Sequence, residues 1–217
     1  MTEALPPMPP AMEPTEAGAP GALLVIVSGP SGVGKDTVIE ALRRRPSAAG
    51  YHYVVTCTTR PRRPYEIDGT HYHFLDEGRF TALRDAGGLL EANEVHGHWY
   101  GTPRDEVRDA LGNGDDAILK IDVQGAAVVK QKVPEALLVF IVPPSLEDLF
   151  GRLQARATET ADELDIRQRD AALELSRQKD FDHVVTNLTG QVERTAKRID
   201  AIIRAEKAAN PDRRTRV

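Results

Sequence analysis

The stretch "VIVSGPSGVGKDTVIEAL" at residues 25–42 decides the fold. Its apolar start belongs to "ALLVIVS" (22–28), a continuous run that is typical of a buried parallel strand. The next part, "GPSGVGKD", follows the phosphate-loop pattern G-x-x-x-x-G-K up to its last position, and "KDTVIEALRRR" predicts a helix. A strand, a glycine loop and a helix in this order indicate a site for nucleotide phosphates.

The glycines of this loop, Gly29, Gly32 and Gly34, allow positive φ angles, so that successive backbone N–H groups can face an anion. Lys35 is placed to reach the β- and γ-phosphates. Asp36 stands where the pattern has a hydroxyl residue that contacts Mg²⁺. A carboxylate is also a hard oxygen ligand for Mg²⁺, but it places negative charge near the phosphates. A loop that no longer functions is therefore the alternative interpretation.

Strands and helices alternate after the loop. Apolar runs predict further buried strands at 116–123, 136–142 and 183–187. Two amphipathic helices are predicted, one capped by Ser145 and one over 191–208. Their predicted inward residues are Leu146, Leu149, Phe150 and Leu153 in the first helix, and Val192, Ile199, Ile202 and Ile203 in the second. This alternation predicts an α/β fold, with three α/β/α layers around a parallel, doubly wound sheet.

Residues 52–103 do not follow this alternation of buried strands and helices. They contain short strand-like pieces, "YVVTCTT" and "THYHFL", and are rich in Arg, Tyr, His and Glu. We interpret this region as an inserted mixed α+β subdomain that recognises the substrate.

Composition limits the class of protein. The chain has 217 residues and a formal net charge of −5, so non-specific binding to nucleic acid or to an anionic membrane is not expected. Its single cysteine cannot form an internal disulfide, and no apolar run approaches the roughly 20 residues that span a bilayer. We therefore expect a cytoplasmic protein.

Both ends of the chain are predicted to be tails. Residues 1–21 hold six of the 15 prolines and few bulky apolar side chains, which predicts a disordered segment. The basic end at 209–217, which contains "NPDRRTRV", is interpreted as solvated.

Several separate motifs occur in the order found in guanylate kinases. "SGPSGVGKD" is followed by "TCTTRPRRPYEIDGTHYHF" (56–74), "LLEANEVHGHWYGTPR" (89–104) and "ILKIDVQGA" (118–126). From about residue 22 to 208 the chain resembles the guanylate kinase family. The resemblance implies transfer of the γ-phosphoryl group of ATP to GMP with Mg²⁺, by a core (22–51, 104–149 and 171–208), a GMP-binding subdomain (52–103) and a helical lid (150–170).

The resemblance also implies roles for individual residues. It places Arg60, Arg63, Tyr72 and Tyr100 around the GMP phosphate, where guanidinium groups and phenols are suitable donors. Glu91 matches the carboxylate that reads guanine, whose N1–H and N2–H₂ are adjacent donors that adenine lacks. The other residues implied to bind GMP are Thr56, Glu66, Thr102 and Asp122. For Thr102, a role as the N-cap of a helix, with Pro103 and Asp105 following, is equally open.

The implied ATP site comprises the loop residues Gly29, Pro30, Ser31, Gly32, Val33, Gly34, Lys35, Asp36 and Thr37, together with Asn187. Asn187 is also open to interpretation as a turn residue at the end of a strand. Arg152, Arg156 and Arg167 fall in the implied lid. Of these we expect Arg152 and Arg167 to act in catalysis beside Lys35 and Arg60, because phosphoryl transfer needs the neutralisation of spread negative charge.

Three positions depart from the family pattern, namely Asp36, Thr56 in place of Ser, and Lys120 in place of an acidic residue. Lys120 and Asp122 point to the same face of one predicted strand, which approaches the phosphate loop. Our hypothesis is a charge exchange, in which Asp36 becomes the magnesium-facing carboxylate and Lys120 offsets its charge.

Three alternative functions are considered. A ribose bisphosphate phosphokinase would not need Glu91 or the full set of arginines and tyrosines. A non-catalytic binding module related to guanylate kinase would not need the intact loop with Lys35. A zinc site could use His71, His73, His96 and His98, although alternating polar residues on an exposed strand explain these histidines equally well.

Overall fold

The computed structural model describes residues 18–95, 97–155 and 161–217, and for residues 155 and 161–167 it describes the backbone alone. Its central element is a sheet of five parallel strands in the order β2-β7-β1-β8-β9. These strands are β1 (Leu24–Ser28), β2 (Tyr51–Tyr53), β7 (Asp116–Lys120), β8 (Leu137–Val142) and β9 (His183–Thr186). The predicted parallel sheet is therefore confirmed.

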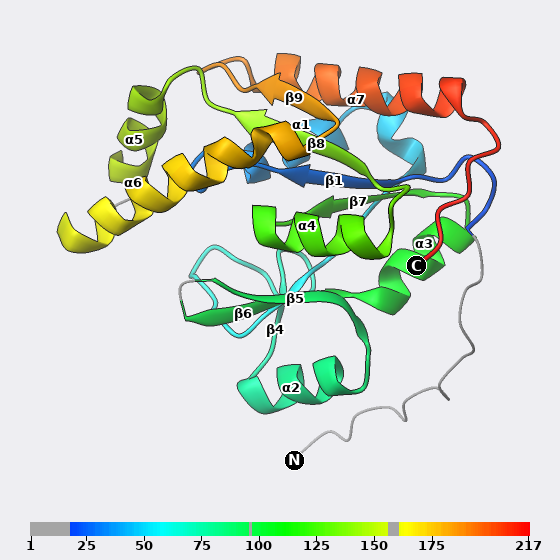
Figure 1. Cartoon of the computed structure of the whole chain (residues 1–217), viewed down its shortest axis with the longest axis horizontal. Helices are drawn as coiled ribbons and strands as arrows, with labels where there is room; N and C mark the ends of the chain where they lie inside the picture. The colour runs from blue at the N-terminus through cyan, green and yellow to red at the C-terminus, as the bar shows by residue number, and fades with distance from the viewer. Residues whose placement is uncertain (1–17, 96, 156–160) are drawn as a thin grey trace.

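Helices cover both faces of this sheet (Figure 1). They are α1 (Lys35–Arg43) and α7 (Val192–Ala209) on one face, and α3 (Arg104–Gly112) and α4 (Val123–Lys132) on the other. Val25 and Val27 of β1 pack in the cluster with α1 and α7, whereas Leu24 and Ile26 pack in the cluster with α3 and α4. Because successive side chains of a strand point to opposite faces, the apolar run fills two cores at once.

The core elements differ from the predicted bounds in identifiable ways. The strand predicted at 116–123 ends at Lys120, because the side chain of Asp122 caps α4 and accepts hydrogen bonds from Gln124 N at 2.7 Å and Gly125 N at 3.0 Å. In α5 (Leu146–Ala155), Ser145 is the expected cap, since its Oγ accepts a hydrogen bond from Asp148 N at 3.0 Å.

The predicted apolar stripe of α5 is correct at Leu149 and Leu153, which are fully buried. The prediction is wrong for Leu146, which is 47% exposed. Leu146 is the first residue of the helix, whereas Leu149 and Leu153, one and two turns further on, pack in the core cluster with β1 and α1.

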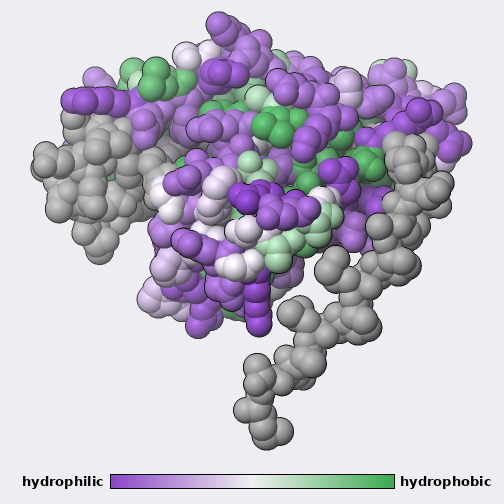
Figure 2. Space-filling view, turned by 60° about the horizontal axis from the view of Figure 1, so that its bottom comes forward, coloured by the Kyte–Doolittle hydropathy of each residue, from purple (hydrophilic) through white to green (hydrophobic). Residues whose placement is uncertain are grey.

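The inserted region forms a second sheet with the strand order β4-β3-β6-β5, which mixes parallel and antiparallel pairs. Its elements are β3 (Cys57–Thr58), β4 (His73–Phe74), α2 (Glu77–Asp85), β5 (Leu89–Val95) and β6 (His98–Pro103). Cys57, Phe80 and Leu89 form its small core. Because β2 pairs with β7 in the central sheet, the insertion begins after residue 53. Figure 2, turned so that this side comes forward, shows mostly hydrophilic side chains with separate hydrophobic patches.

The remaining helices lie beyond the ends of the core strands. Two short 3₁₀ turns, η1 (Pro46–Gly50) and η2 (Arg177–Asp180), precede β2 and β9. The helices α5 and α6 (Ala161–Ser176) lie together at one side of the molecule (Figure 1). No helix in the described part of the chain is long and apolar enough to cross a bilayer.

The two ends of the described chain pack against each other. Gly18 N donates to Thr215 O at 3.0 Å, and Gly21 N donates to Arg213 O at 2.9 Å. Thr215 is buried, and its hydroxyl donates to Ala22 O at 3.1 Å. The predictions of a disordered tail up to residue 21 and of a solvated C-terminal end are therefore wrong for these residues, because each segment satisfies the backbone groups of the other. Residues 1–17 lie outside the described residues.

Candidate active site

A cavity of about 620 Å³ opens between the phosphate loop, the end of β7 and the inserted sheet. Its size is in the range of small-molecule sites. The predicted site residues that line it are Ser31, Lys35, Asp36, Thr56, Arg60, Arg63, Tyr72, Glu91, Tyr100 and Asp122. Lys120, Glu174 and His98 line it as well. The fold thus brings residues of the predicted ATP site and of the predicted GMP site to one cavity.

The phosphate loop adopts the conformation that its glycines predict. Gly29, Gly32 and Gly34 have φ angles of 149°, 82° and 96°. A Cβ on Gly29 would lie 2.4 Å from Ile141 O, so this position requires glycine for space as well as for φ. The loop wraps the side chain of Lys35, whose Nζ donates to Gly29 O at 2.5 Å and to the carbonyl of the next residue at 3.1 Å.

Two side chains hold this loop from behind. Asn187 Nδ2 donates to Val33 O at 2.9 Å, while its Oδ1 accepts from Thr195 Oγ1 at 3.1 Å. Arg152 Nη1 donates to the same carbonyl of Val33 at 3.1 Å, and its Nη2 donates to Thr189 Oγ1 at 2.8 Å. Neither side chain lines the cavity, so both contact the loop rather than the space that it encloses. Their direct contacts with ATP stay predictions.

The other predicted lid arginines are not placed. Arg156 lies outside the described residues, and Arg167 lies in α6 where the structure describes the backbone alone.

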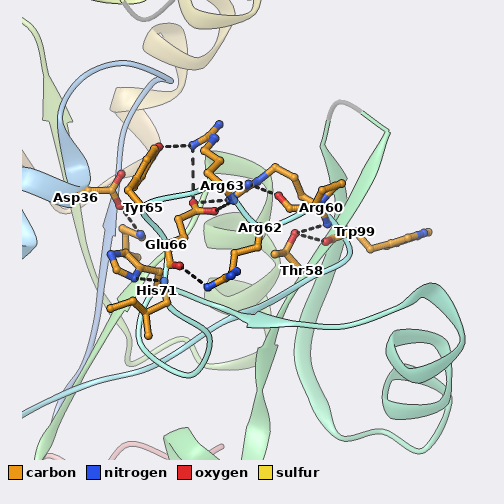
Figure 3. Close-up of polar contacts among 12 residues, drawn as sticks. Asp36, Thr58, Arg60, Arg62, Arg63, Tyr65, Glu66, His71 and Trp99 are labelled. Carbon is orange, nitrogen blue, oxygen red and sulfur yellow. Dashed lines mark hydrogen bonds and ion pairs between the residues drawn. The ribbon is translucent and has the colours of Figure 1, made fainter.

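A buried carboxylate organises the predicted phosphate-binding arginines (Figure 3). Glu66 is 4% exposed, and its Oε1 accepts from Arg60 Nη2 at 2.7 Å while its Oε2 accepts from Arg63 N at 2.8 Å. Arg62 Nη1 donates to the backbone carbonyl of Glu66 at 3.0 Å. Burial by itself would raise the pKa of Glu66, but the hydrogen bonds and charges of the arginines lower it. Glu66 thus positions Arg60 and Arg63 and does not line the cavity, and its predicted contact with GMP stays a prediction.

Two tyrosines complete the cationic wall of the cavity. The rings of Tyr72 and Tyr100 pack edge to face with centroids 6.0 Å apart, and the guanidinium of Arg60 lies 5.6 Å from the Tyr72 centroid. Burial raises the pKa of Tyr72, so its hydroxyl stays a protonated donor. Together these groups present donors and positive charge, the chemistry that binds a phosphate monoester.

The proposed partners of the charge exchange are in contact. Lys120 Nζ donates a hydrogen bond to Asp36 Oδ1, which confirms the predicted pairing. The parallel register, in which Val27 pairs with Lys120, brings the end of β7 beside the phosphate loop. The magnesium-facing role of Asp36 remains a prediction.

Glu91 lines the same cavity from β5 and is 3% exposed. Its Oε1 accepts from Thr102 Oγ1 at 2.6 Å, and its Oε2 accepts from Asn93 Nδ2 at 2.7 Å. Burial raises its pKa to about 7, although both hydrogen bonds oppose the shift. Each carboxylate oxygen accepts one of these hydrogen bonds and has a further lone pair for an incoming donor.

The alternative of Thr102 as a helix cap is wrong. The N-cap position of α3 is Pro103, no side chain caps that helix, and the Thr102 hydroxyl is used on Glu91 instead. A fully buried hydroxyl beside a buried carboxylate has a stronger partner there than at a helix end.

Sequence reasoning missed two functional candidates. Asn93 follows Glu91 by two positions, so the strand period of two already places both side chains on one face. Glu174 comes from α6, and its Oε2 accepts from Ser31 N in the phosphate loop at 2.9 Å. No local pattern links residues 143 positions apart, so the contact between Glu174 and Ser31 could be found only in the tertiary structure.

The described residues do not support the zinc interpretation. They contain no group of three or more His, Cys, Asp or Glu side chains that could hold a metal ion. His71 Nδ1 accepts from Ile67 N at 3.0 Å, which gives that ring a local structural role. His96 lies outside the described residues.

A phosphate loop at the end of a parallel strand, facing a second wall of arginines and tyrosines, defines the class of phosphate-loop kinases. The sequence model of the family "Guanylate kinase" matches residues 22–206. This chain belongs to the guanylate kinase family.

Individual relatives agree with this assignment. The chain is 46% identical over 182 residues to the guanylate kinase of Mycobacterium bovis, which covers 82% of this chain and 86% of the relative. It is 41% identical over 193 residues to guanylate kinase 2, chloroplastic/mitochondrial, of Oryza sativa subsp. japonica, which covers 88% of this chain and 67% of the relative. The crystal structure of guanylate kinase from Anaplasma phagocytophilum matches with a TM-score of 0.69 and 30% identity over 88% of each chain.

Proposed function

We propose that this protein transfers the γ-phosphoryl group of ATP to GMP, giving ADP and GDP. The observation that carries this proposal is the buried carboxylate of Glu91, held by Thr102 and Asn93 in the same cavity as the phosphate loop. Guanine presents N1–H and N2–H₂ side by side, and an ionised carboxylate accepts both. Adenine presents an acceptor at N1, which would leave the remaining lone pairs of the buried carboxylate without a donor from the base, at a cost of about 1–3 kcal/mol or more.

The chain's own residues explain how the two phosphates are brought together. The loop amides and Lys35 hold the phosphates of ATP, while Arg60, Arg63 and the two cavity tyrosines hold the phosphate of GMP. Phosphoryl transfer has a loose transition state, so catalysis consists mainly of in-line positioning and of neutralising charge. The rigid contact between Arg60 and Glu66 at 2.7 Å pre-organises the acceptor side.

We propose that the divalent ion of this reaction is Mg²⁺. Asp36 fits this role by its chemistry, since it offers a hard oxygen ligand, lines the cavity and is 69% exposed at the start of α1. Mg²⁺ in kinases is bound by one or two carboxylates together with substrate phosphates and waters. The ion would supply charge neutralisation at the phosphates.

We also infer that the GMP-binding subdomain lies within residues 52–103 and begins after β2, that 150–170 act as a lid, and that 22–51, 104–149 and 171–208 belong to the core. The cavity between the inserted sheet and the phosphate loop supports this division. The proposed partners are ATP and GMP, and the net charge of −5 argues against nucleic acid and anionic membranes. A cytoplasmic location fits the single buried cysteine.

A coupled assay of ADP release tests the proposed function with GMP, AMP, UMP, CMP and ribose 1,5-bisphosphate as acceptors. We expect kcat/KM for GMP to exceed that for AMP by about 10²-fold or more, because only guanine satisfies Glu91. Higher turnover with ribose 1,5-bisphosphate would favour the phosphokinase alternative. Absence of turnover with every acceptor would favour a binding module.

Guanine binding should weaken as the pH falls through about 7, because the buried Glu91 then takes up a proton. The ionised form accepts the guanine donors, so protonation of the free protein competes with binding. The Kd for guanosine should rise about tenfold per pH unit below the pKa of Glu91. Isothermal titration calorimetry with guanosine checks this, because guanosine has no phosphate that titrates in the same range. A Kd that stays constant from pH 5.5 to 8 would contradict the prediction.

A further inference from the structure

An ion pair lies where the donor and acceptor halves of the cavity meet. Asp36 comes from the first turn of α1, next to Lys35, and Lys120 ends β7. Lys120 Nζ donates to Asp36 Oδ1 and lies 5.1 Å from the ring centroid of Tyr72, which belongs to the inserted region. The ammonium therefore touches the phosphate-loop helix on one side and the predicted GMP-phosphate wall on the other.

The environment of Lys120 keeps it charged. Its side chain is 22% exposed, and burial alone would lower its pKa. Tyr72 and Asp36 together outweigh this effect and raise the pKa of Lys120, while Lys35 is the other cation that interacts with it. A lysine ammonium is a compact charge on a flexible stem, so it can exchange one anionic partner for another without moving its backbone.

We propose that Lys120 is a phosphate-binding residue that contacts the phosphoryl group passing between ATP and GMP, and that Asp36 holds its ammonium in place in the free protein. This inference rests on the proposed function. The transferred group must cross the boundary between Lys35 and Tyr72, and Lys120 occupies this boundary. A phosphate oxygen entering there replaces the exposed carboxylate of Asp36 as the acceptor of the ammonium.

The Lys120→Gln variant tests the proposal directly. We expect kcat for ATP and GMP to fall by about 10²-fold, because a cation at the transferred group is lost. In titrations without metal, the Kd for GMP should rise about fivefold while the Kd for guanosine stays unchanged, since only GMP carries a phosphate. Lys120→Arg keeps the charge and should retain most of the activity. Lys197→Gln, on an exposed position of α7, controls for the change of net charge.

The Asp36→Asn variant separates a phosphate ligand from a structural ion pair. If Lys120 binds phosphate, removing its competing carboxylate should leave metal-free GMP binding unchanged or make it tighter. If the pair only supports the fold, each variant should weaken the binding of GMP and of guanosine to the same extent. Each should also lower the melting temperature of the protein. That result, or a Lys120→Gln protein with unchanged kcat and unchanged Kd for GMP, would overturn the inference. Failure of the wild-type protein to phosphorylate GMP would instead refute the proposed function, and the Kd comparison would still test Lys120.

Discussion

The Lys35→Met variant is expected to lose about 10³-fold in kcat with ATP and GMP, while its Kd for GMP changes by less than about twofold. The Lys35 ammonium lies inside the loop, where it donates to Gly29 O at 2.5 Å and Pro30 O at 3.1 Å. These carbonyls hold the charge at the centre of the loop, ready for the phosphates of ATP. Methionine keeps the apolar stem and removes only the charge.

Steady-state kinetics measures the expected loss of kcat. Calorimetry with GMP measures the Kd for GMP, which should stay nearly unchanged. Burial lowers the pKa of Lys35, and the charges of the Glu174 and Asp36 carboxylates oppose that shift. Lys179→Met, at an exposed position, is the matched control. A Lys35→Met enzyme with kcat within tenfold of the wild type would show that the loop amides alone hold the donor.

The second large effect concerns the choice of base. Glu91→Gln should lower kcat/KM for GMP by about 10²-fold and reduce the preference for GMP over AMP by at least as much. The amide keeps the shape of the side chain but has lost the negative charge, and it can accept at only one of its two ends. The Thr102 hydroxyl at 2.6 Å and the Asn93 amide at 2.7 Å both donate to this group, so the Gln amide faces a donor on one side.

Initial rates measured at several concentrations of GMP and of AMP give kcat/KM for each nucleotide. Their ratio gives the preference for GMP. Glu94→Gln is the control, because Glu94 lies on the same strand but is exposed. An unchanged preference between the two nucleotides in Glu91→Gln would remove the basis of the assignment to GMP.

Several site residues could be predicted because their signals are local. Gly29, Gly34 and Lys35 follow a fixed spacing between a buried strand and a helix, and the structure places them in one loop. The contact between Lys120 and Asp36 was also predictable, since a phosphate loop and the end of the neighbouring parallel strand meet at the same edge of the sheet.

Other predictions failed or stayed open where distant segments compete for one group. The Thr102 hydroxyl had a local partner in the helix that follows, yet a residue eleven positions away on the neighbouring strand binds it. Glu66 was expected to bind GMP, which stays open, and in the structure its carboxylate accepts from Arg60 and from the backbone of Arg63. Arg152 was expected to act in catalysis, which stays open, and in the structure its guanidinium donates to Val33 O at 3.1 Å in the phosphate loop.

The amino-acid sequence alone determined the α/β class, the phosphate loop and the series of guanylate kinase motifs. These features depend on hydrophobic periodicity and on residues a few positions apart. Only the folded chain decided which polar groups share a partner. Glu174 meets Ser31 N at 2.9 Å, and Thr215 meets Ala22 O at 3.1 Å, across most of the chain length. Such pairings arise because leaving a buried donor or acceptor without a partner is costly, and the partner is found by proximity in space rather than in sequence.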